Sequence, residues 1–429
     1  MIIGINESGE KVSSASARIS TTSGDAFATL EKSQNRQKNL NLINKVLSSG
    51  HYSIAEHTVF NIAFCNVSAV VEQFMIEFRL ASFTVKSRRY VNFSDAGFYT
   101  PQKFLNDKKY EDHINRLFAL YSDLIEHDVP KEDARFLLPY SFYSNFYATV
   151  NARELLHMIK SMLCGHGSAF QEIHSIGKEL LSQALEIAPA FFDKIGDEIF
   201  SAEDLGDVYV EPINISKKIE ILNSTPDAIK ILDHASMVWT GKPADVSHIV
   251  QKTRPRELEQ LTYTIKLGGL SLSSITHLVR HRMQSVIIPP LTAVNHDNYI
   301  VPDSISALGG DILERYEEAF QDTKDLTEQL RSDGATPHEL AYLILSGHTL
   351  NVITTMNARE LLLFFKLRTC NRAQWEIREY AIELLEQLRS LSGDIFGKMG
   401  ATCFVQGSCA EGRLTCGEMH KVIEKFRLR

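Results

Sequence analysis

Residues 357–379 read NARELLLFFKLRTCNRAQWEIRE, and the beginning of this stretch occurs a second time in the chain. Asn-Ala-Arg-Glu-Leu-Leu also stands at residues 151–156, an offset of 357 − 151 = 206. An asparagine followed three residues later by a glutamate is typical of a helix start, because the two side chains can cap the first turn. Both copies therefore predict a helix that opens at the asparagine.

Two further pairs of segments precede these helices in the same order. FRLAS at 78–82 matches HRMQS at 281–285, and EHTVFNIAF from Glu56 matches EQLTYTIKL from Glu259, each at an offset of 203 (281 − 78 and 259 − 56). Three matched segments at nearly one offset indicate a duplication. A length of 429 residues agrees with two domains. We predict domains at 1–212 and 213–429, joined near 205–225.

Each half shows the same coarse order of elements. NIAF and TYTIKL alternate as half-buried strands do, and VSAVVEQFMIEFR and LSLSSITHLVRHR predict helices that end at the 78–82 and 281–285 segments. Two long helical patterns follow in each half, and then the helix that opens at Asn-Ala-Arg. An amphipathic helix comes last. The predicted fold class is α+β: two tandem domains, each helix-rich with a small, mainly antiparallel sheet.

Composition and charge limit the classes of function. Hydrophobic residues make up 44% and charged residues 23%, which is ordinary for a soluble globular protein. A formal net charge of −8 argues against a general nucleic-acid binder, although a local basic pocket for a small anion remains possible. The first 14 residues show no signal-peptide pattern, and no apolar run of 18 residues exists, so we expect a cytoplasmic protein without a membrane span.

The motifs together resemble the flavin-dependent thymidylate synthase (ThyX) family. That family carries RHRxxSxNExSxRY, an upstream HxS/TxxEH, a middle ARxxLP and a downstream NAREL with LRxxxxAQWEIR. The first half holds ARIS (17–20), GHYSIAEH (50–57), SFTVKSRRY (82–90) and ARFLLP (134–139). The second half holds Arg280-His281-Arg282 and the whole of 357–379. The resemblance implies two ThyX-like domains, the second with a cysteine-containing extension at its end.

Each half has lost what the other keeps. The first half reads Glu77-Phe78-Arg79 in place of Arg-His-Arg, and Met162 stands where the second half has Arg368. The second half reads IPPLTA (288–293) in place of the nucleotide loop, and Ala341 in place of the ARxxLP arginine. Members of the family are homotetramers with sites between subunits. The resemblance therefore implies composite sites between unlike halves, in a homodimer of fused chains that carries one FAD per chain.

The resemblance also implies roles for individual residues. Arginine forks suit a nucleotide phosphate, and positive charge stabilises a reduced, anionic flavin. The implied catalytic residues are Arg280, Arg368 and Ser87. The implied substrate-binding residues are Ser87, Arg88, Arg89, Arg135, Arg280 and Arg368. The implied FAD-binding residues are Ser20, His51, Ser53, Glu56, Arg280, His281, Arg282, Asn357, Arg359, Leu367 and Arg372.

The implied reaction is the reductive methylation of dUMP to dTMP with FAD, NADPH and methylenetetrahydrofolate. No cysteine stands at a motif position that would suggest an attacking thiol. Thr84 and Val85 replace the Asn-Glu pair of the signature, and His277 replaces a usual glutamine. These departures leave two alternatives open: a methylase of another pyrimidine nucleotide such as UMP, or a flavin- or nucleotide-binding scaffold without turnover.

Three of the six cysteines crowd the end of the chain. Cys403, Cys409 and Cys416, with His420 nearby, have the spacing C-x5-C-x6-C. This is not a standard zinc pattern, and three clustered cysteines do not resemble a disulfide framework. The sequence therefore predicts a structural extension without a metal.

Overall fold

The structure, a computed structural model, describes residues 9–193 and 218–427, so the predicted boundary at 212/213 lies outside the described residues. The chain forms two compact units. Unit 1 comprises Met1–Ala119, Pro139–Tyr209 and Leu326–Leu343, and unit 2 comprises Leu120–Leu138, Val210–Asp325 and Ile344–Arg429. Each unit thus contains a short segment from the other half of the sequence.

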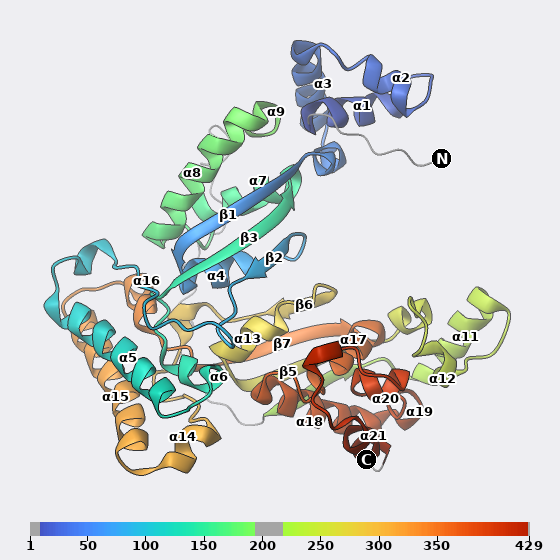
Figure 1. Cartoon of the computed structure of the whole chain (residues 1–429). Coiled ribbons are helices and arrows are strands. Elements are labelled where there is room, and N and C mark those ends of the chain that lie inside the picture. Colours follow the sequence, from blue (N-terminus) through green and yellow to red (C-terminus); the bar gives the residue numbers. More distant parts are fainter. Residues whose placement is uncertain (1–8, 194–217, 428–429) are drawn as a thin grey trace. The chain divides into compact units, whose positions relative to one another are not determined.

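Unit 1 is built on a three-stranded antiparallel sheet with the order β1-β3-β2 (Figure 1). Its strands are β1 (Val59–Ser68), β2 (Ser82–Val85) and β3 (Tyr143–Asn151). Its main helices are α1 (Gly9–Ile19), α2 (Ala26–Glu31), α3 (Arg36–Ser48), α4 (Ala69–Ile76), α7 (Ala152–Leu163), α8 (Gln171–Ile187), α9 (Pro189–Phe192) and α16 (Pro337–Leu340). Its single-turn helices are η1 (Tyr52–His57), η2 (Gln102–Phe104) and η6 (Ala341–Leu343).

Unit 2 is built on a four-stranded antiparallel sheet with the order β4-β5-β7-β6. Its strands are β4 (Ile219–Ser224), β5 (Thr262–Ser271), β6 (Gln284–Ile287) and β7 (Thr349–Asn357). Its helices include α6 (Lys131–Ala134), α11 (Ala228–Thr240), α12 (Val246–Ile249), α13 (Leu272–Leu278), α14 (Asp303–Leu308), α17 (Ala358–Arg368), α18 (Trp375–Leu391), α19 (Gly393–Phe396), α20 (Thr402–Gln406) and α21 (Met419–Arg427). Its single-turn helices are η3 (Arg135–Leu137), η4 (Arg256–Gln260), η5 (Leu291–Ala293) and η7 (Gly412–Leu414).

The two sheets repeat the same strand pairing, register and irregularity. Val59 pairs with Asn151 in unit 1, and Thr262, 203 positions on, pairs with Asn357 in unit 2. The ladder shifts after Phe64 in one sheet and after Leu267 in the other, again 203 positions apart. A bulge kept at the same position shows that the sequence repeat is also a structural repeat. The α+β class with small antiparallel sheets is confirmed.

The central strand of each sheet differs from the prediction. The sequence pattern predicted two long helices before each Asn-Ala-Arg helix. The structure has one long helix in each half, α5 (Lys108–Glu126) and α15 (Gly310–Ser332), and then a strand, β3 or β7, that ends at the asparagine. In β3, buried and accessible residues alternate, which is the burial of a strand with one covered face. That alternation outweighs the helical pattern.

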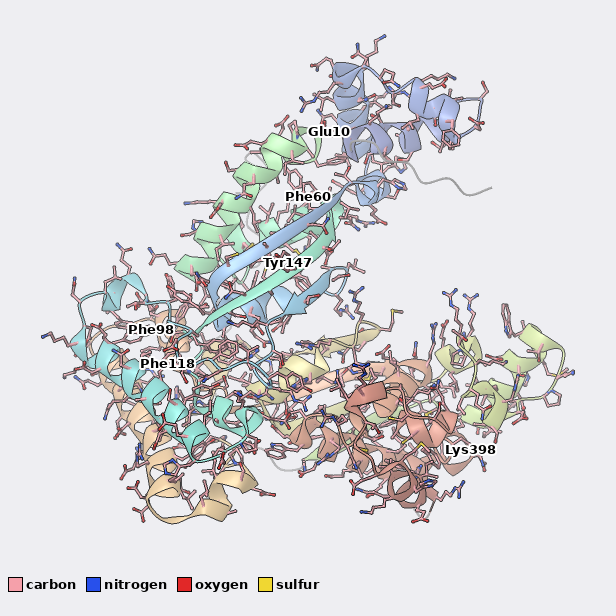
Figure 2. The ribbon with its side chains drawn as sticks, in the orientation of Figure 1. Glu10, Phe60, Phe98, Phe118, Tyr147 and Lys398 are labelled. Atoms are coloured by element: carbon pink, nitrogen blue, oxygen red, sulfur yellow. The ribbon has the colours of Figure 1, made fainter. Side chains whose placement is uncertain are left out.

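Aromatic packing closes the core of unit 1. Phe60 of β1 is buried against Phe192, with ring centroids 5.8 Å apart, whereas Tyr147 on β3 is exposed (Figure 2). Phe98 stacks on Phe118 at 6.1 Å between centroids. Burying aromatic side chains of this size is a large apolar contribution to stability. Of the helices that the structure describes, none is both long and apolar enough to cross a membrane.

Candidate functional site

A buried chain of polar contacts in unit 2 links α17 to the Arg280-His281-Arg282 motif. The imidazole Nδ1 of His281 lies 2.9 Å from Oε1 of Glu360, and Nε of Arg368 donates to Nε2 of His281 at 3.1 Å. The guanidinium is always a donor, so Nε2 accepts and the ring proton stands on Nδ1. Burial lowers the pKa of His281, which agrees with a neutral ring. The cluster therefore fixes one tautomer of His281.

The same cluster also holds the last turn of α13. Arg368 also donates to the carbonyl of His277, in the last turn of α13, at 3.0 Å. His281 is only 3% exposed, whereas Arg280 and Arg282 are exposed. The buried His281 therefore lies between two exposed arginines.

The helix that carries Arg368 begins at a capped asparagine. Oδ1 of Asn357 accepts the backbone N–H of Glu360 at 2.8 Å, as the Asn-Ala-Arg-Glu pattern predicted. In unit 1, Asn151 caps α7 in the same way, at 2.9 Å from the amide of Glu154. Both predicted helix starts are confirmed, and the asparagine side chain is a structural cap in each half.

A cavity of about 240 Å³ lies beside the start of α17. Its wall includes Asn357, Arg359 and Glu360, together with two lysines, Lys252 and Lys366. Arg359 forms an ion pair with Glu259, and Lys252 lies 2.5 Å from Glu257. Burial lowers the pKa of Lys366. Lysine, arginine and amide side chains can bind phosphate oxygens, and the wall also holds the carboxyl groups of Glu259 and Glu360.

Sequence reasoning missed both lysines of this cavity. Lys366 stands seven residues after Arg359 on α17, which places the two cations on the same face of the helix. That spacing was a signal in the sequence. Lys252 precedes η4, and no motif pointed to it.

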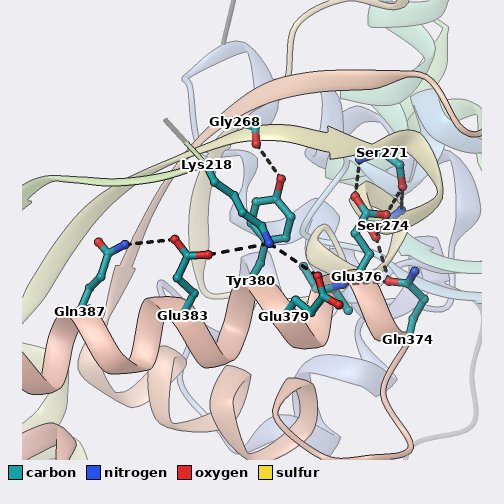
Figure 3. A network of polar contacts seen from close by, with 11 residues as sticks. Lys218, Gly268, Ser271, Ser274, Gln374, Glu376, Glu379, Tyr380, Glu383 and Gln387 are labelled. Atoms are coloured by element: carbon teal, nitrogen blue, oxygen red, sulfur yellow. Dashed lines mark hydrogen bonds and ion pairs between the residues drawn. The ribbon is translucent and has the colours of Figure 1, made fainter. Parts of the chain in front are cut away.

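The downstream motif residues Gln374 and Glu376 hold the helix that leads to Arg280 (Figure 3). Glu376 accepts the Ser271 backbone N–H at 2.8 Å and the Ser271 and Ser274 hydroxyls at 2.5 and 2.7 Å. Gln374 accepts from the Ser274 hydroxyl and caps α18. Burial raises the pKa of Glu376. These residues fix the N-terminus of α13.

A second network on α18 fastens the edge strand β4 (Figure 3). Nζ of Lys218 lies 4.7 Å from the centre of the Tyr380 ring and 3.6 and 3.8 Å from Glu379 and Glu383. The Tyr380 hydroxyl donates to the Gly268 carbonyl at 2.6 Å. The helix behind the cluster is therefore held to two strands of the sheet.

Arg135, from the first half of the sequence, belongs to unit 2. It is 2% exposed, its Nε donates to the Glu132 carbonyl at 3.0 Å, and its charge favours ionised Glu376. Trp375 donates from Nε1 to Asp133 at 2.7 Å, which anchors the segment 120–138. The structure therefore brings a predicted nucleotide residue of the first half into the unit that contains Arg280 and Arg368.

The predicted nucleotide loop lies in unit 1, after β2. Oγ of Ser87 accepts the Arg89 amide at 3.3 Å, and Arg89 lies over the Tyr90 ring. The Arg88 side chain is 6% exposed and pairs with Glu72 at 2.6 Å. A guanidinium held by a buried carboxylate anchors this loop, and a nucleotide contact by Arg88 stays a prediction.

The remaining predicted flavin residues are solvent-accessible. Ser20 follows α1, His51 and Ser53 lie at η1, and Glu56 pairs with Arg153 at 2.6 Å. In unit 2, Leu367 near the end of α17 and Arg372 in the next turn are both exposed. Unit 1 thus holds Ser20, His51, Ser53, Glu56, Ser87, Arg88 and Arg89, and unit 2 holds the other predicted residues.

The corresponding position in unit 1 is apolar. Phe78, the counterpart of His281, packs edge-on against the ring of His157 at 5.5 Å, and Met162, the counterpart of Arg368, is fully buried. Glu77 accepts a hydrogen bond from Gln73 at 2.8 Å, and burial raises its pKa to about 7. The first half has therefore replaced a fixed cationic cluster by apolar contacts and a carboxyl group.

Comparisons with known proteins match the chain in two successive segments. The family described as "Thymidylate synthase complementing protein" matches residues 2–190 and 220–392. The flavin-dependent thymidylate synthase of Geobacter sulfurreducens is 36% identical over 174 residues, 40% of this chain and 74% of that protein. Those of Nitratidesulfovibrio vulgaris and Clostridium tetani are 30% and 32% identical, over 94% and 96% of their own lengths but only 47% and 48% of this chain. These relatives therefore have about half the length of this chain.

A crystal structure of the UMP/dUMP methylase PolB from Streptomyces cacaoi, bound with 5-Br dUMP, also aligns. It is 24% identical, with a TM-score of 0.37, over 44% of this chain and 91% of that chain. At that score the match supports no conclusion on substrate. The family match covers most of the chain in two successive segments, and the chain belongs to the flavin-dependent thymidylate synthase family of enzymes.

Proposed function

We propose that the protein is an FAD-dependent thymidylate synthase that converts dUMP to dTMP with methylenetetrahydrofolate and NADPH. The observation that carries the proposal is the fixed Glu360-His281-Arg368 cluster beside a cavity whose wall holds three cations and two carboxyl groups. The signature residues of the family thus retain an ordered, charged arrangement in the second half. Decay of function would remove the selection that keeps a buried charged network satisfied.

The cluster acts by preorganised charge. His281 is neutral, so the positive charge at this point comes from Arg368 and from the exposed Arg280 and Arg282. A cation held by fixed hydrogen bonds needs no reorganisation when negative charge develops on a ligand. Arg359, Lys366 and Asn357 at the cavity would hold the phosphates of FAD. When bound, FAD supplies the hydride chemistry, and the protein's contribution is binding and orientation.

We propose further that the complete site is composite. Ser87 and Arg89 of unit 1 would bind the nucleotide. Arg135, Arg280 and Arg368, which all lie in unit 2, would form the other side of the site. The position with Glu77 and Met162 places a carboxyl group where a phosphate-rich ligand needs cations, which would weaken its binding about a hundredfold or more. We therefore expect a homodimer with one FAD per chain, checked by flavin absorbance against protein mass.

Label transfer distinguishes the proposal from its alternatives. Methylenetetrahydrofolate labelled in its methylene group is supplied with unlabelled NADPH and with dUMP, UMP or dCMP. In a parallel assay, tritium release from C5-labelled nucleotide is followed. The proposal expects label transfer only when dUMP is the substrate, which gives labelled dTMP together with tritium release. Transfer to UMP instead would identify a methylase of another pyrimidine nucleotide. Tight FAD binding without transfer, and without substrate-stimulated NADPH oxidation, would identify a scaffold and overturn the proposal.

A further inference from the structure

Four cysteines of unit 2 line one small cavity. Cys370 follows α17, Cys403 lies in α20, Cys409 lies in the loop after it, and Cys416 precedes α21. The cavity has a volume of about 20 Å³, enough for a single ion or water. The rest of its wall consists of Asn371, Thr402, Ala410, Glu411, Met419 and Val422. Cys370 lies 403 − 370 = 33 residues before the C-terminal three, so the fold and not the spacing assembles the set.

A backbone amide points at one of these sulfurs. The amide of Glu418, two residues after Cys416, donates to its Sγ at 3.5 Å, across Gly417 with φ +75°. Amide donors stabilise a thiolate and so favour sulfur as a metal ligand. Glycine adopts a positive φ at little cost, so Gly417 allows the chain to turn between Cys416 and the amide of Glu418.

The chemistry of the cavity selects among the uses of four thiols. Four sulfur donors suit a tetrahedral zinc ion, whose charge removes the thiol protons. An iron–sulfur cluster also takes four cysteines, but it is several atoms across and exceeds a space for one ion.

We propose that Cys370, Cys403, Cys409 and Cys416 bind one zinc ion that fastens the C-terminal extension to the end of α17. Within the described residues, no three such ligands already stand around a common point, so binding would draw the thiols inward. Side-chain hydrogen bonds already join the surrounding segments. The Thr402 hydroxyl donates to the Lys366 carbonyl at 3.1 Å, and the Asn371 amide donates to the Glu418 carboxylate at 3.2 Å.

Metal analysis of the full chain tests the site. Protein purified under reducing conditions from zinc-supplemented cells is analysed by elemental mass spectrometry, with one zinc per chain expected. Cys403→Ser and Cys416→Ser should each lose most of that zinc. Cys65→Ser and Cys164→Ser remove the two cysteines outside the cavity and are the matched controls, which should keep it.

Cobalt spectroscopy keeps the test independent of variant folding. Metal-stripped wild-type chain, shown to be folded by circular dichroism, is titrated with Co²⁺. Intense visible bands of a tetrahedral site, with thiolate-to-cobalt charge transfer and a one-to-one endpoint, are expected. Folded protein with neither zinc nor these bands would overturn the proposal. So would iron–sulfur absorption, a native disulfide among the four cysteines, or equal zinc loss in Cys65→Ser.

Discussion

At the scale of single residues, the two halves have diverged at a few corresponding positions. His281 and Arg368 in unit 2 correspond to Phe78 and Met162 in unit 1, so one buried polar cluster has become an apolar contact. We propose that the exposed arginines beside the cluster contact an anion. Residues from both halves should then be needed for one activity.

We expect Arg280→Ala and Arg89→Ala each to lower kcat/KM for methyl transfer by roughly a hundredfold or more. Each removes a charge-assisted contact worth up to about 3 kcal/mol, although the two residues stand in different halves. Arg79→Ala is the control, because Arg79 is likewise exposed but belongs to the degenerate motif. Equal losses from Arg79→Ala and Arg280→Ala would contradict a division of labour between the halves. Steady-state kinetics provide the measurement.

Glu77 gives a pH-dependent prediction for stability. Burial raises its pKa from 4.5 to about 7, so between these values the unfolded chain loses its proton before the folded chain does. The free energy of unfolding therefore falls as pH rises from about 4.5 to 7, by at most about 3 kcal/mol. Glu77→Gln should raise the melting temperature at pH 8 and change it little at pH 4.5.

Thermal unfolding at several pH values checks this expectation. Glu186→Gln is the control, since Glu186 is exposed on α8 of the same unit. A Glu77→Gln gain that is the same at pH 4.5 and pH 8 would show that the carboxyl group is not the cause.

At the scale of elements, each half keeps a serine that caps the helix before its motif. Ser271 caps α13 and binds Glu376, while Ser68 caps α4 and binds Glu172 with the same pair of contacts, at 2.9 and 2.5 Å. The caps are equivalent structurally, but only α13 leads to the His281 cluster. A change at the two serines separates stability from function.

We expect Ser271→Ala and Ser68→Ala to lower stability by similar amounts, on the order of 1–3 kcal/mol. Each loses a cap and leaves a buried carboxylate with one donor fewer. Only Ser271→Ala should also reduce flavin content and turnover, because α13 positions Arg280. Melting curves and flavin absorbance are measured together. Ser68→Ala with a flavin loss as large as that of Ser271→Ala would show that the two helices contribute equally.

At the scale of the whole molecule, the units are not the halves of the sequence. Unit 1 contains Leu326–Leu343 and unit 2 contains Leu120–Leu138, each supplied by the other half. In unit 2 the segment supplied by the first half is held at Asp133. The carboxyl group of Asp133 accepts hydrogen bonds from Trp375 at 2.7 Å and from Ser304 at 2.6 Å. A half expressed alone would therefore lack part of its own core.

We expect residues 1–212 and 213–429, expressed separately, to be inactive and to unfold well below the intact chain. Co-expressed, they should copurify and recover methyl transfer, because each then receives its missing segment. Affinity capture through a tag on one half, followed by the label-transfer assay, tests this. Robust turnover by either half alone would contradict both the exchange of segments and the composite site.

The sequence carried the duplication, the fold class and the position of the charged motif, because these depend on local patterns. The caps at Asn151 and Asn357 depend only on residues a few positions apart, and so does the alternation in β1 and β5. These features could therefore be predicted from the sequence. The central strands β3 and β7 were missed, because a nine-residue strand is short and its pairing partners lie far away in the chain.

Only the tertiary structure decided which residues meet. The neutral tautomer of His281 depends on Arg368, 87 residues away, and the burial of Arg88 depends on Glu72. The exchange of the 120–138 and 326–343 segments, and the gathering of Cys370 with the C-terminal cysteines, likewise arise from packing across long stretches of chain. Local periodicity specifies an element and its buried face. The partner of that face is set by which distant surfaces bury the most apolar area and satisfy the buried polar groups.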